Sequence, residues 1–303
     1  MLGKRGFDMP FGWIFAIVAG VVIIFLAIYF STRFVSLQQT TVGTETSKQI
    51  GILLDPLETS FESAQTTSFT ISPESRIYNI CDSFGTFGTQ TIQLSQSSFN
   101  QWKKTNIDVS FENKYLFSDS QVQGRTFFAF SKPFNLPFKV ADLIYLTSSE
   151  KQYCFENAPS NIAEELNNLN QSNIFTGNCP ANSINVCFNS GSSCDISVSY
   201  NANYLEKNGT RMDFYSDALM YAAVFSDKNV YDCQVKRLME RTHELISLYQ
   251  NKISIILGKG CTSNLGGDLT QLDNALGSGD INSIGSLADN LNAENENTQC
   301  TIW

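Results

Sequence analysis

A run of uncharged, mostly apolar residues near the N-terminus constrains this chain more than any other feature. Residues 10–30 (PFGWIFAIVAGVVIIFLAIYF) contain no charged side chain. As an α-helix they would be about 31 Å long, close to the thickness of the hydrocarbon core of a bilayer. The sequence therefore predicts a single transmembrane helix over residues 10–30.

The charges that flank this run predict its orientation. Lys4, Arg5 and the α-amino group precede it and are offset only by Asp8, whereas Arg33 alone follows it closely. Because positively charged flanks stay on the cytoplasmic side, we expect residues 1–9 in the cytoplasm and the rest of the chain outside. The lipid bilayer is thus the first expected partner.

A cleaved signal peptide is the alternative interpretation of the same run. Signal peptides have an apolar core of about 7–15 residues that ends in small residues of the Ala-x-Ala kind. The present run is longer and continues as Ala-Ile-Tyr-Phe-Ser-Thr-Arg, without such a site. A retained anchor is therefore the favoured prediction.

The four residues at positions 4–7, Lys-Arg-Gly-Phe, resemble the cleavage site of type IV prepilins and related archaeal secreted subunits. In those families a basic pair and a glycine precede the cut, and a long apolar helix follows it. The resemblance implies Gly6 as the last leader residue, Phe7 as the first mature residue, and a filament subunit as the function. The chain departs from the bacterial pattern at Phe11, where those pilins have a glutamate.

The charge balance beyond the apolar run excludes two kinds of partner. Without Lys4, Arg5 and Asp8, the totals of 20 basic and 29 acidic residues fall to 18 and 28, a formal charge of −10. Nucleic acids require clustered Lys and Arg side chains, and anionic lipid headgroups attract basic segments. We therefore expect no nucleic acid and no electrostatic binding to anionic lipid.

All eight cysteines lie beyond the apolar run, on the side predicted to be oxidising. They are Cys81, Cys154, Cys179, Cys187, Cys194, Cys233, Cys261 and Cys300. An even number on that side predicts up to four disulfides. Cys187 and Cys194 flank a Ser/Gly-rich segment between two alternating segments, which predicts a β-hairpin closed by a disulfide. Cys261 with Cys300 is the second expected pair.

Residues 69–204 have the composition of short strands separated by Gly, Asn, Ser and Pro. The expected strands are residues 69–72, 76–81, 91–94, 107–111, 125–130 and 152–155. Residues 131–146 contain two prolines among large apolar side chains. This segment is predicted to fill the core, with a partner-binding loop as the alternative.

Helices are expected within and after this strand-rich part. Residues 161–169 predict a short helix, and residues 229–257 a long amphipathic one that Gly258 ends. Residues 212–225 contain a continuous apolar run that fits a buried strand or a buried helix. After residue 261, two short helices are expected, either docked on the head or partly mobile.

The fold class predicted from these elements is α+β. Its expected organisation is a cytoplasmic N-terminus (1–9), a transmembrane helix (10–30), a stalk (31–68), an extracytoplasmic head (69–260) and a C-terminal helical region (261–303).

The sequence offers few residues for catalysis or for metal binding. His243 is the single histidine and opens a zincin-like pattern, but Ser247 stands where the second histidine must be. Cys-x-x-Cys is absent. We therefore expect no enzyme activity, no cofactor and no metal.

Two other sets of residues are candidates for modification or contact. Asn170 and Asn208 begin the sequons Asn-Gln-Ser and Asn-Gly-Thr, which could accept glycans in an exported chain. Gly12, Ala16 and Gly20 form a ridge of small residues that would let two membrane helices approach closely.

These observations predict a non-enzymatic, membrane-anchored cell-surface protein with an adhesive, interacting or structural role in the envelope. By its membrane helix and its Lys/Asn/Ser bias the chain resembles small single-pass surface proteins of archaea. The alternatives are a pilin-like filament subunit and a subunit of an envelope membrane complex. The expected partners besides lipid are other envelope or surface proteins, further copies of this chain included.

Overall fold

The computed structural model describes residues 12–31, 65–98, 101–104, 108–188, 194–261, 263–298 and 300–303. We call the described residues from 65 onward the head. The expected leader site at Gly6 and Phe7, the segment 1–9 and nearly all of the expected stalk lie outside the described residues.

The N-terminal apolar helix, Gly12–Ser31, is 20 residues long with a mean hydropathy of 2.8, and its apolar window is not buried by the rest of the chain. Its length and composition fit a membrane anchor or a signal sequence. Gly12, Ala16 and Gly20 are spaced four residues apart and so share one face of this helix. Their contact with another helix stays a prediction.

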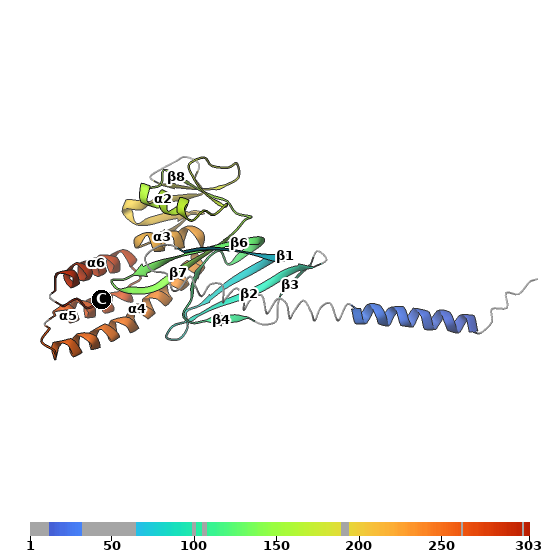
Figure 1. The fold of residues 1–303 in the computed structure, drawn as a ribbon, viewed down its shortest axis with the longest axis horizontal. Helices are drawn as coiled ribbons and strands as arrows, with labels where there is room; N and C mark the ends of the chain where they lie inside the picture. The colour runs from blue at the N-terminus through green and yellow to red at the C-terminus, as the bar shows by residue number, and fades with distance from the viewer. Residues whose placement is uncertain are drawn as a thin grey trace, which may run out of the picture.

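The head is built on two sheets, which we call the large and the small sheet (Figure 1). The large sheet contains, in spatial order, β3 (Gln101–Lys104), β2 (Thr89–Ser98), β1 (Gln65–Asp82), β6 (Gln121–Asn135), β7 (Lys139–Ser148) and β5 (Tyr115–Phe117), and β4 (Val109–Phe111) also pairs with β2. The pairings are antiparallel except that of β5 with β7. The expected mixture of helix and sheet is thus confirmed.

The large sheet curls strongly. Two neighbours, β6 and β7, separate β1 from β5 in the sheet order. Nevertheless, Nδ2 of Asn79 on β1 donates to the backbone oxygen of Leu116 on β5 (3.1 Å) and to Oγ of Ser118 (2.8 Å). The curl encloses a small apolar cluster, which includes Ile77, Ile92 and Ile144.

Strand β1 joins two of the expected strands into one. Residues 69–72 and 76–81 both fall within it, and the register with β6 shifts between Thr70 and Ser75. The proline that follows Ser72 lies at this irregularity, where it removes no ladder hydrogen bond. A proline between two alternating segments therefore marked a bulge in one strand and not a turn between two strands.

The segment 131–146 completes β6 and forms most of β7, so the core-filling interpretation is confirmed. Phe134, Leu136 and Phe138 are each no more than 2% exposed. The alternative, a partner-binding loop, is wrong because these large side chains point into the head.

The small sheet has the order β13 (Thr210–Asp213), β12 (Tyr204–Lys207), β11 (Ile196–Ser199), β10 (Ile184–Phe188), β8 (Tyr153–Glu156) and β9 (Ile174–Thr176). Strands β9, β8, β10 and β11 are parallel to one another, and β12 and β13 continue in antiparallel pairs. A single 3-10 turn, η2 (Tyr200–Ala202), lies between β11 and β12.

The eight cysteines form four disulfides, Cys81–Cys233, Cys154–Cys179, Cys187–Cys194 and Cys261–Cys300. The two pairs expected from the sequence are among them.

The hairpin expected around Cys187 and Cys194 is wrong, because β10 and β11 run parallel. By residue 195 the chain has returned to the start of β10, where the Asp195 N–H donates to the Asn185 oxygen (3.0 Å) and the Asn185 N–H donates to Asp195 Oδ2 (2.8 Å). The second strand therefore starts beside the beginning of the first.

Five helices of the described chain pack on these sheets: α2 (Ser160–Asn168), α3 (Ser216–Phe225), α4 (Lys228–Leu257), α5 (Leu265–Leu276) and α6 (Ile281–Asn297). Helix α3 lies between the two sheets and contacts β6 and β7 on one side and β12 on the other (Figure 1). All eight residues from Ala218 to Phe225 are buried. The apolar run is therefore a helix that is buried on all sides. Because it has no polar face, its hydrophobic periodicity could not distinguish a helix from a strand.

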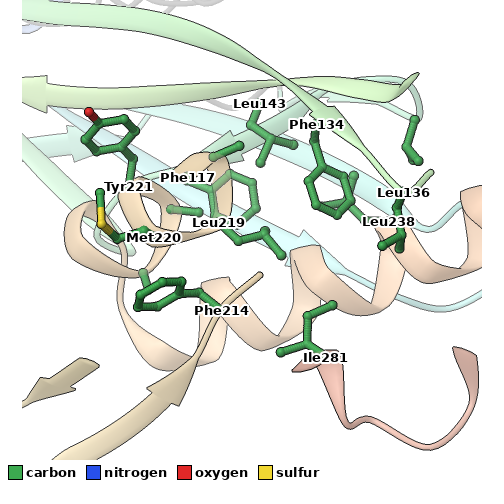
Figure 2. Close-up of a cluster of buried hydrophobic side chains, with 14 of the residues drawn as sticks. Phe117, Phe134, Leu136, Leu143, Phe214, Leu219, Met220, Tyr221, Leu238 and Ile281 are labelled. Carbon is green, nitrogen blue, oxygen red and sulfur yellow. The ribbon is translucent and has the colours of Figure 1, made fainter. Parts of the chain in front are cut away.

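The main core forms where the helices meet the large sheet. Figure 2 shows Phe134 and Leu143 of the sheet pointing toward Leu219 of α3 and Leu238 of α4. Ile281 of α6 belongs to the same cluster, so the C-terminal helices dock on the rest of the head and share its core.

Helix α4 confirms the long amphipathic helix expected over residues 229–257. Its end is closed by a pair of backbone bonds, from the N–H of Cys261 to the Ile256 oxygen (3.2 Å) and from the N–H of Gly260 to the Leu257 oxygen (3.1 Å). The glycine with positive φ (+91°) is Gly260, whereas Gly258 keeps helical angles. The stop signal thus lies two residues beyond the expected Gly258.

Candidate binding sites in the head

A recess lies where the two sheets meet, and we call it the junction recess. Its volume is about 260 Å³, and its polar lining includes Asp119, Gln121, Gln123, Ser148, Glu150 and Lys151. Residue 119 belongs to the turn between β5 and β6, and residue 151 to the turn between β7 and β8. The sheet topology therefore brings together two turns that the sequence gives no reason to pair.

Charged groups beside the recess are paired with one another. The carboxylate of Asp119 forms ion pairs with Lys151 and, at 3.8 Å, with Nζ of Lys207 on β12. The carboxylate of Asp227 accepts a hydrogen bond from the N–H of Ser120 (2.7 Å). Acidic and basic side chains thus neutralise each other across the junction of the sheets.

Lys207 also completes the end of the central helix. Its Nζ donates to the backbone oxygens of Val224 (3.0 Å) and Ser226 (3.1 Å), at the C-terminal end of α3. A cation is favoured there because the last carbonyls of a helix lack intrahelical partners. Burial lowers the pKa of Lys207, and the nearby carboxylates of Asp119 and Asp227 oppose that effect.

The pKa of Asp227 is shifted by its surroundings. Burial alone would raise it, but the hydrogen bonds from Ser120 and the charge of Lys207 outweigh burial and lower the pKa. This carboxylate is therefore held in its charged form, as an acceptor and not as a proton donor.

The junction recess is small, and part of its polar lining is engaged in ion pairs. Its volume is just below the roughly 300–1,000 Å³ of ordinary small-molecule sites. Three charged groups at this place, Asp119, Lys151 and Lys207, form ion pairs with one another. Among the described residues, no three His, Cys, Asp or Glu side chains are placed to hold a metal ion.

The loop between β1 and β2 is the second candidate site. It carries the large apolar side chain of the head with the greatest exposure, Phe84 at 88%. Phe87 in the same loop is 36% exposed, and Ile80 near the end of β1 is 45% exposed. We call residues 83–87 the loop tip.

The loop is fastened to α4 at its base. The disulfide Cys81–Cys233 joins the end of β1 to the first turns of α4, with a Cα–Cα distance of 6.1 Å. One helical turn further on, Nε of Arg237 donates to the backbone oxygen of Phe87 (2.9 Å). The loop is thus held covalently at one end and by a hydrogen bond at the other.

Arg237 is fully buried, and its guanidinium donates hydrogen bonds to backbone oxygens of two different loops. Besides the Phe87 oxygen, its guanidinium donates to the oxygens of Lys114 (2.9 Å) and Glu112 (2.8 Å) and to Oε1 of Gln234 (2.8 Å). Tyr115 lies under the cation, 4.8 Å from the ring centroid. The buried charge is therefore compensated by carbonyl dipoles and an aromatic face.

Gly88 ends the loop at a place where only glycine fits. Its φ is +56°, and a Cβ there would lie 2.3 Å from the Asp82 oxygen and 3.0 Å from Cγ of Arg237. At the other end, Oδ1 of Asp82 accepts the N–H of Phe84 (2.9 Å). The loop tip is thus exposed while its base is tightly constrained.

The residues singled out in the sequence do not converge on one site. His243 lies on the outer face of α4, and its Nδ1 is 2.5 Å from Oδ1 of Asp273 on α5. This hydrogen bond with the aspartate raises the pKa of His243. The histidine therefore links two helices.

Both glycan-acceptor asparagines are exposed in turns. Asn170 follows α2 and has a positive φ of 51°. Asn208 and Gly209, with φ of 52° and 70°, form the two-residue turn between β12 and β13, where Lys207 is opposite Thr210. Both side chains are accessible to modification, and their glycosylation stays a prediction.

Sequence reasoning missed both candidate sites. The loop tip has a visible signal, Ser-Phe-Gly-Thr-Phe-Gly directly after Asp82, since two glycines beside two phenylalanines between strands mark an aromatic turn. The junction recess has no such signal, because its charged lining residues come from two turns about 30 residues apart in the chain, and Lys207 on β12 approaches them only in the folded head.

No family model, no curated protein and no solved structure matches this chain.

Proposed function

We propose that this protein is a single-pass, membrane-anchored surface protein whose head acts by binding other components of the envelope. The observation that carries the proposal is the distribution of cysteines around the apolar helix. All eight cysteines follow the helix, and all eight are joined in four disulfides. Structural disulfides persist in oxidising compartments, so this distribution supports a head outside the cytoplasm.

The helix supports the anchoring part of the proposal. A signal sequence with this composition would be removed, and the head would then be released. The absence of an Ala-x-Ala site after the helix and the basic residues before it favour retention with the N-terminus inside.

We propose binding and not catalysis because charged side chains of the head form ion pairs and helix caps, whereas the exposed loop tip is apolar. At the junction recess, Asp119 is paired with Lys151 and Lys207, and Lys207 also caps the central helix. The most unusual exposed feature is the apolar loop tip, and exposed apolar groups on a supported backbone are typical of interaction surfaces.

A pilin-like filament subunit is the second candidate. It is favoured by the basic pair and glycine that precede Phe7 and by the apolar helix that begins shortly afterwards. In that case Gly12, Ala16 and Gly20 would contact neighbouring subunits within the filament.

Protease accessibility on intact cells tests the proposed topology. With epitope tags at both ends of the full chain, an added protease should remove the C-terminal tag and leave the N-terminal tag with the membrane. Protection of the C-terminal tag until the cells are lysed would overturn the proposal. Recovery of the C-terminal tag in sheared filaments would favour the pilin-like alternative.

A further inference from the structure

The loop tip is a small apolar protrusion on a firm base. Phe84 is 88% exposed, more than any other large apolar side chain described in the head. The disulfide Cys81–Cys233 and the Arg237 hydrogen bond to Phe87 hold the loop on α4. The exposure of Phe84 is therefore a property of a supported conformation.

The tip can leave water without burying a charge. Residues 83–89 (SFGTFGT) contain no charged side chain. The nearest one in sequence, Asp82, lies at the base of the loop, where its carboxylate accepts the N–H of Phe84. Moving Phe84 into an apolar phase thus requires no ion pair and no basic residue.

The size of the tip argues against a protein partner bound through it alone. Phe84, Phe87 and Ile80 together expose apolar area on the order of 300 Å². A stable protein–protein interface buries about 800 Å² on each partner and needs a complementary surface. A bilayer needs no complementary shape, and its interfacial region takes up aromatic side chains.

We propose that the loop tip inserts Phe84 into the interfacial region of a phospholipid bilayer and so seats the head on the membrane. The inference rests on the proposed membrane anchor, because attachment to the same bilayer raises the effective concentration of lipid at the tip. One shallow contact is then sufficient. Because the tip has no basic residue and the head is acidic, zwitterionic lipid suffices and salt has little effect.

Tryptophan fluorescence on the full chain in vesicles tests this proposal. In a Trp13→Phe background, which removes the tryptophan of the apolar helix, one variant carries Phe84→Trp and a matched control carries Leu248→Trp. The emission of the background protein, which comes from Trp102 and Trp303, is subtracted from both. Leu248 is 62% exposed on the outer face of α4. Both substitutions are at exposed positions, so both variants should fold. The vesicles are phosphatidylcholine with or without brominated acyl chains.

The expected result is that brominated lipid quenches the F84W signal at least twofold more than the L248W signal. The emission of F84W should also be shifted to shorter wavelength, and 0.5 M salt should change neither result. Equal quenching of F84W and L248W in protein that floats with the vesicles would overturn the inference. Quenching that requires anionic lipid would also overturn it.

Flotation separates this inference from the proposed function. If the chain floats with the vesicles but position 84 is not quenched, the membrane anchor stands and the insertion of the loop tip is refuted. A protein partner for the tip would then be the remaining explanation. Chain that does not float refutes the anchor itself.

Discussion

Cys81 on β1 and Cys233 on α4 are 152 residues apart in sequence, and their sulfurs are bonded with the Cα atoms 6.1 Å apart. This bond joins the first strand of the large sheet to the longest helix of the head. It also forms the base of the loop tip, because Cys81 lies just before the loop. The disulfide Cys81–Cys233 therefore both stabilises the fold of the head and supports the exposed loop tip.

Removing this disulfide should destabilise the head more than removing the shortest one. In the chain-entropy description, a bond that closes a loop of 152 residues contributes about 5 kcal/mol, and one that closes seven residues about 2.5 kcal/mol. The variants are C81S/C233S and, as the control, C187S/C194S. Urea unfolding without reductant measures both, and equal losses would contradict the account.

Replacing Arg237 by methionine should cost about 3–5 kcal/mol of unfolding free energy, because three backbone oxygens would lose their buried donor. Those oxygens belong to Phe87, Glu112 and Lys114. The matched control is Lys236→Met at the exposed neighbouring position, which should change stability by no more than about 0.5 kcal/mol. Amide exchange of residues 83–88 should accelerate in R237M and stay unchanged in K236M. Unchanged exchange in R237M would show that Arg237 does not hold the loop.

Two helical glycines should respond to alanine in opposite directions. A Cβ on Gly285 of α6 would lie 2.1 Å from Cδ2 of Tyr215, whereas one on Gly267 of α5 meets nothing within 4 Å. G285A must displace a ring whose hydroxyl lies 2.5 Å from Oδ1 of Asp289, so it should destabilise by about 1–3 kcal/mol. G267A should stabilise by up to about 1 kcal/mol through helix propensity. Thermal unfolding compares the two variants, and a loss in both would contradict this explanation.

The bond between His243 and Asp273 should make stability depend weakly on pH. The bond raises the pKa of His243 in the folded protein above its unfolded value. The stabilisation is therefore fully present below about pH 6.5 and is lost as the pH rises through the folded pKa. Since both side chains are partly exposed, at 51% and 26%, the effect should be a few tenths of a kcal/mol.

A nuclear magnetic resonance titration measures this pKa directly, because the chain contains one histidine. The pKa should fall toward about 6.5 in D273N. An unchanged pKa in that variant would show that the aspartate is not the cause.

The helices could be predicted from the sequence where one face of the helix meets water. Helix α4 has that pattern, and so does α2. Helix α3 does not, because it lies between two sheets and all residues from Ala218 to Phe225 are buried. A helix that is apolar all round has no periodic signal, so only the tertiary structure could identify it.

The strands could be located from alternation, but their directions could not be predicted. Alternation gives the two faces of a strand and contains no information on its neighbour. The parallel pairing of β10 with β11 depends on how the chain returns to Asn185 at residue 195. The turn between β12 and β13 had a usable local signal in Asn208-Gly209.

The candidate sites were the least predictable part. Asp119, Lys151 and Lys207 meet only because the two sheets meet, and no spacing in the sequence anticipates this. The support of the loop tip by Arg237 was equally hidden, since 150 residues separate Arg237 from Phe87. In a one-dimensional pattern Arg237 looks like a solvated helix residue, whereas the structure buries it completely.

The central claim is that the chain is retained in the membrane with its head on the oxidising side. Intact mass measurement of the protein from native membranes, alkylated without reductant, tests both parts. The account predicts a chain that keeps both the residues before Phe7 and the apolar helix, and that carries no alkyl group on its eight cysteines. A chain that starts beyond residue 31, or cysteines that are alkylated, would contradict the account, and a start at Phe7 would favour the filament subunit.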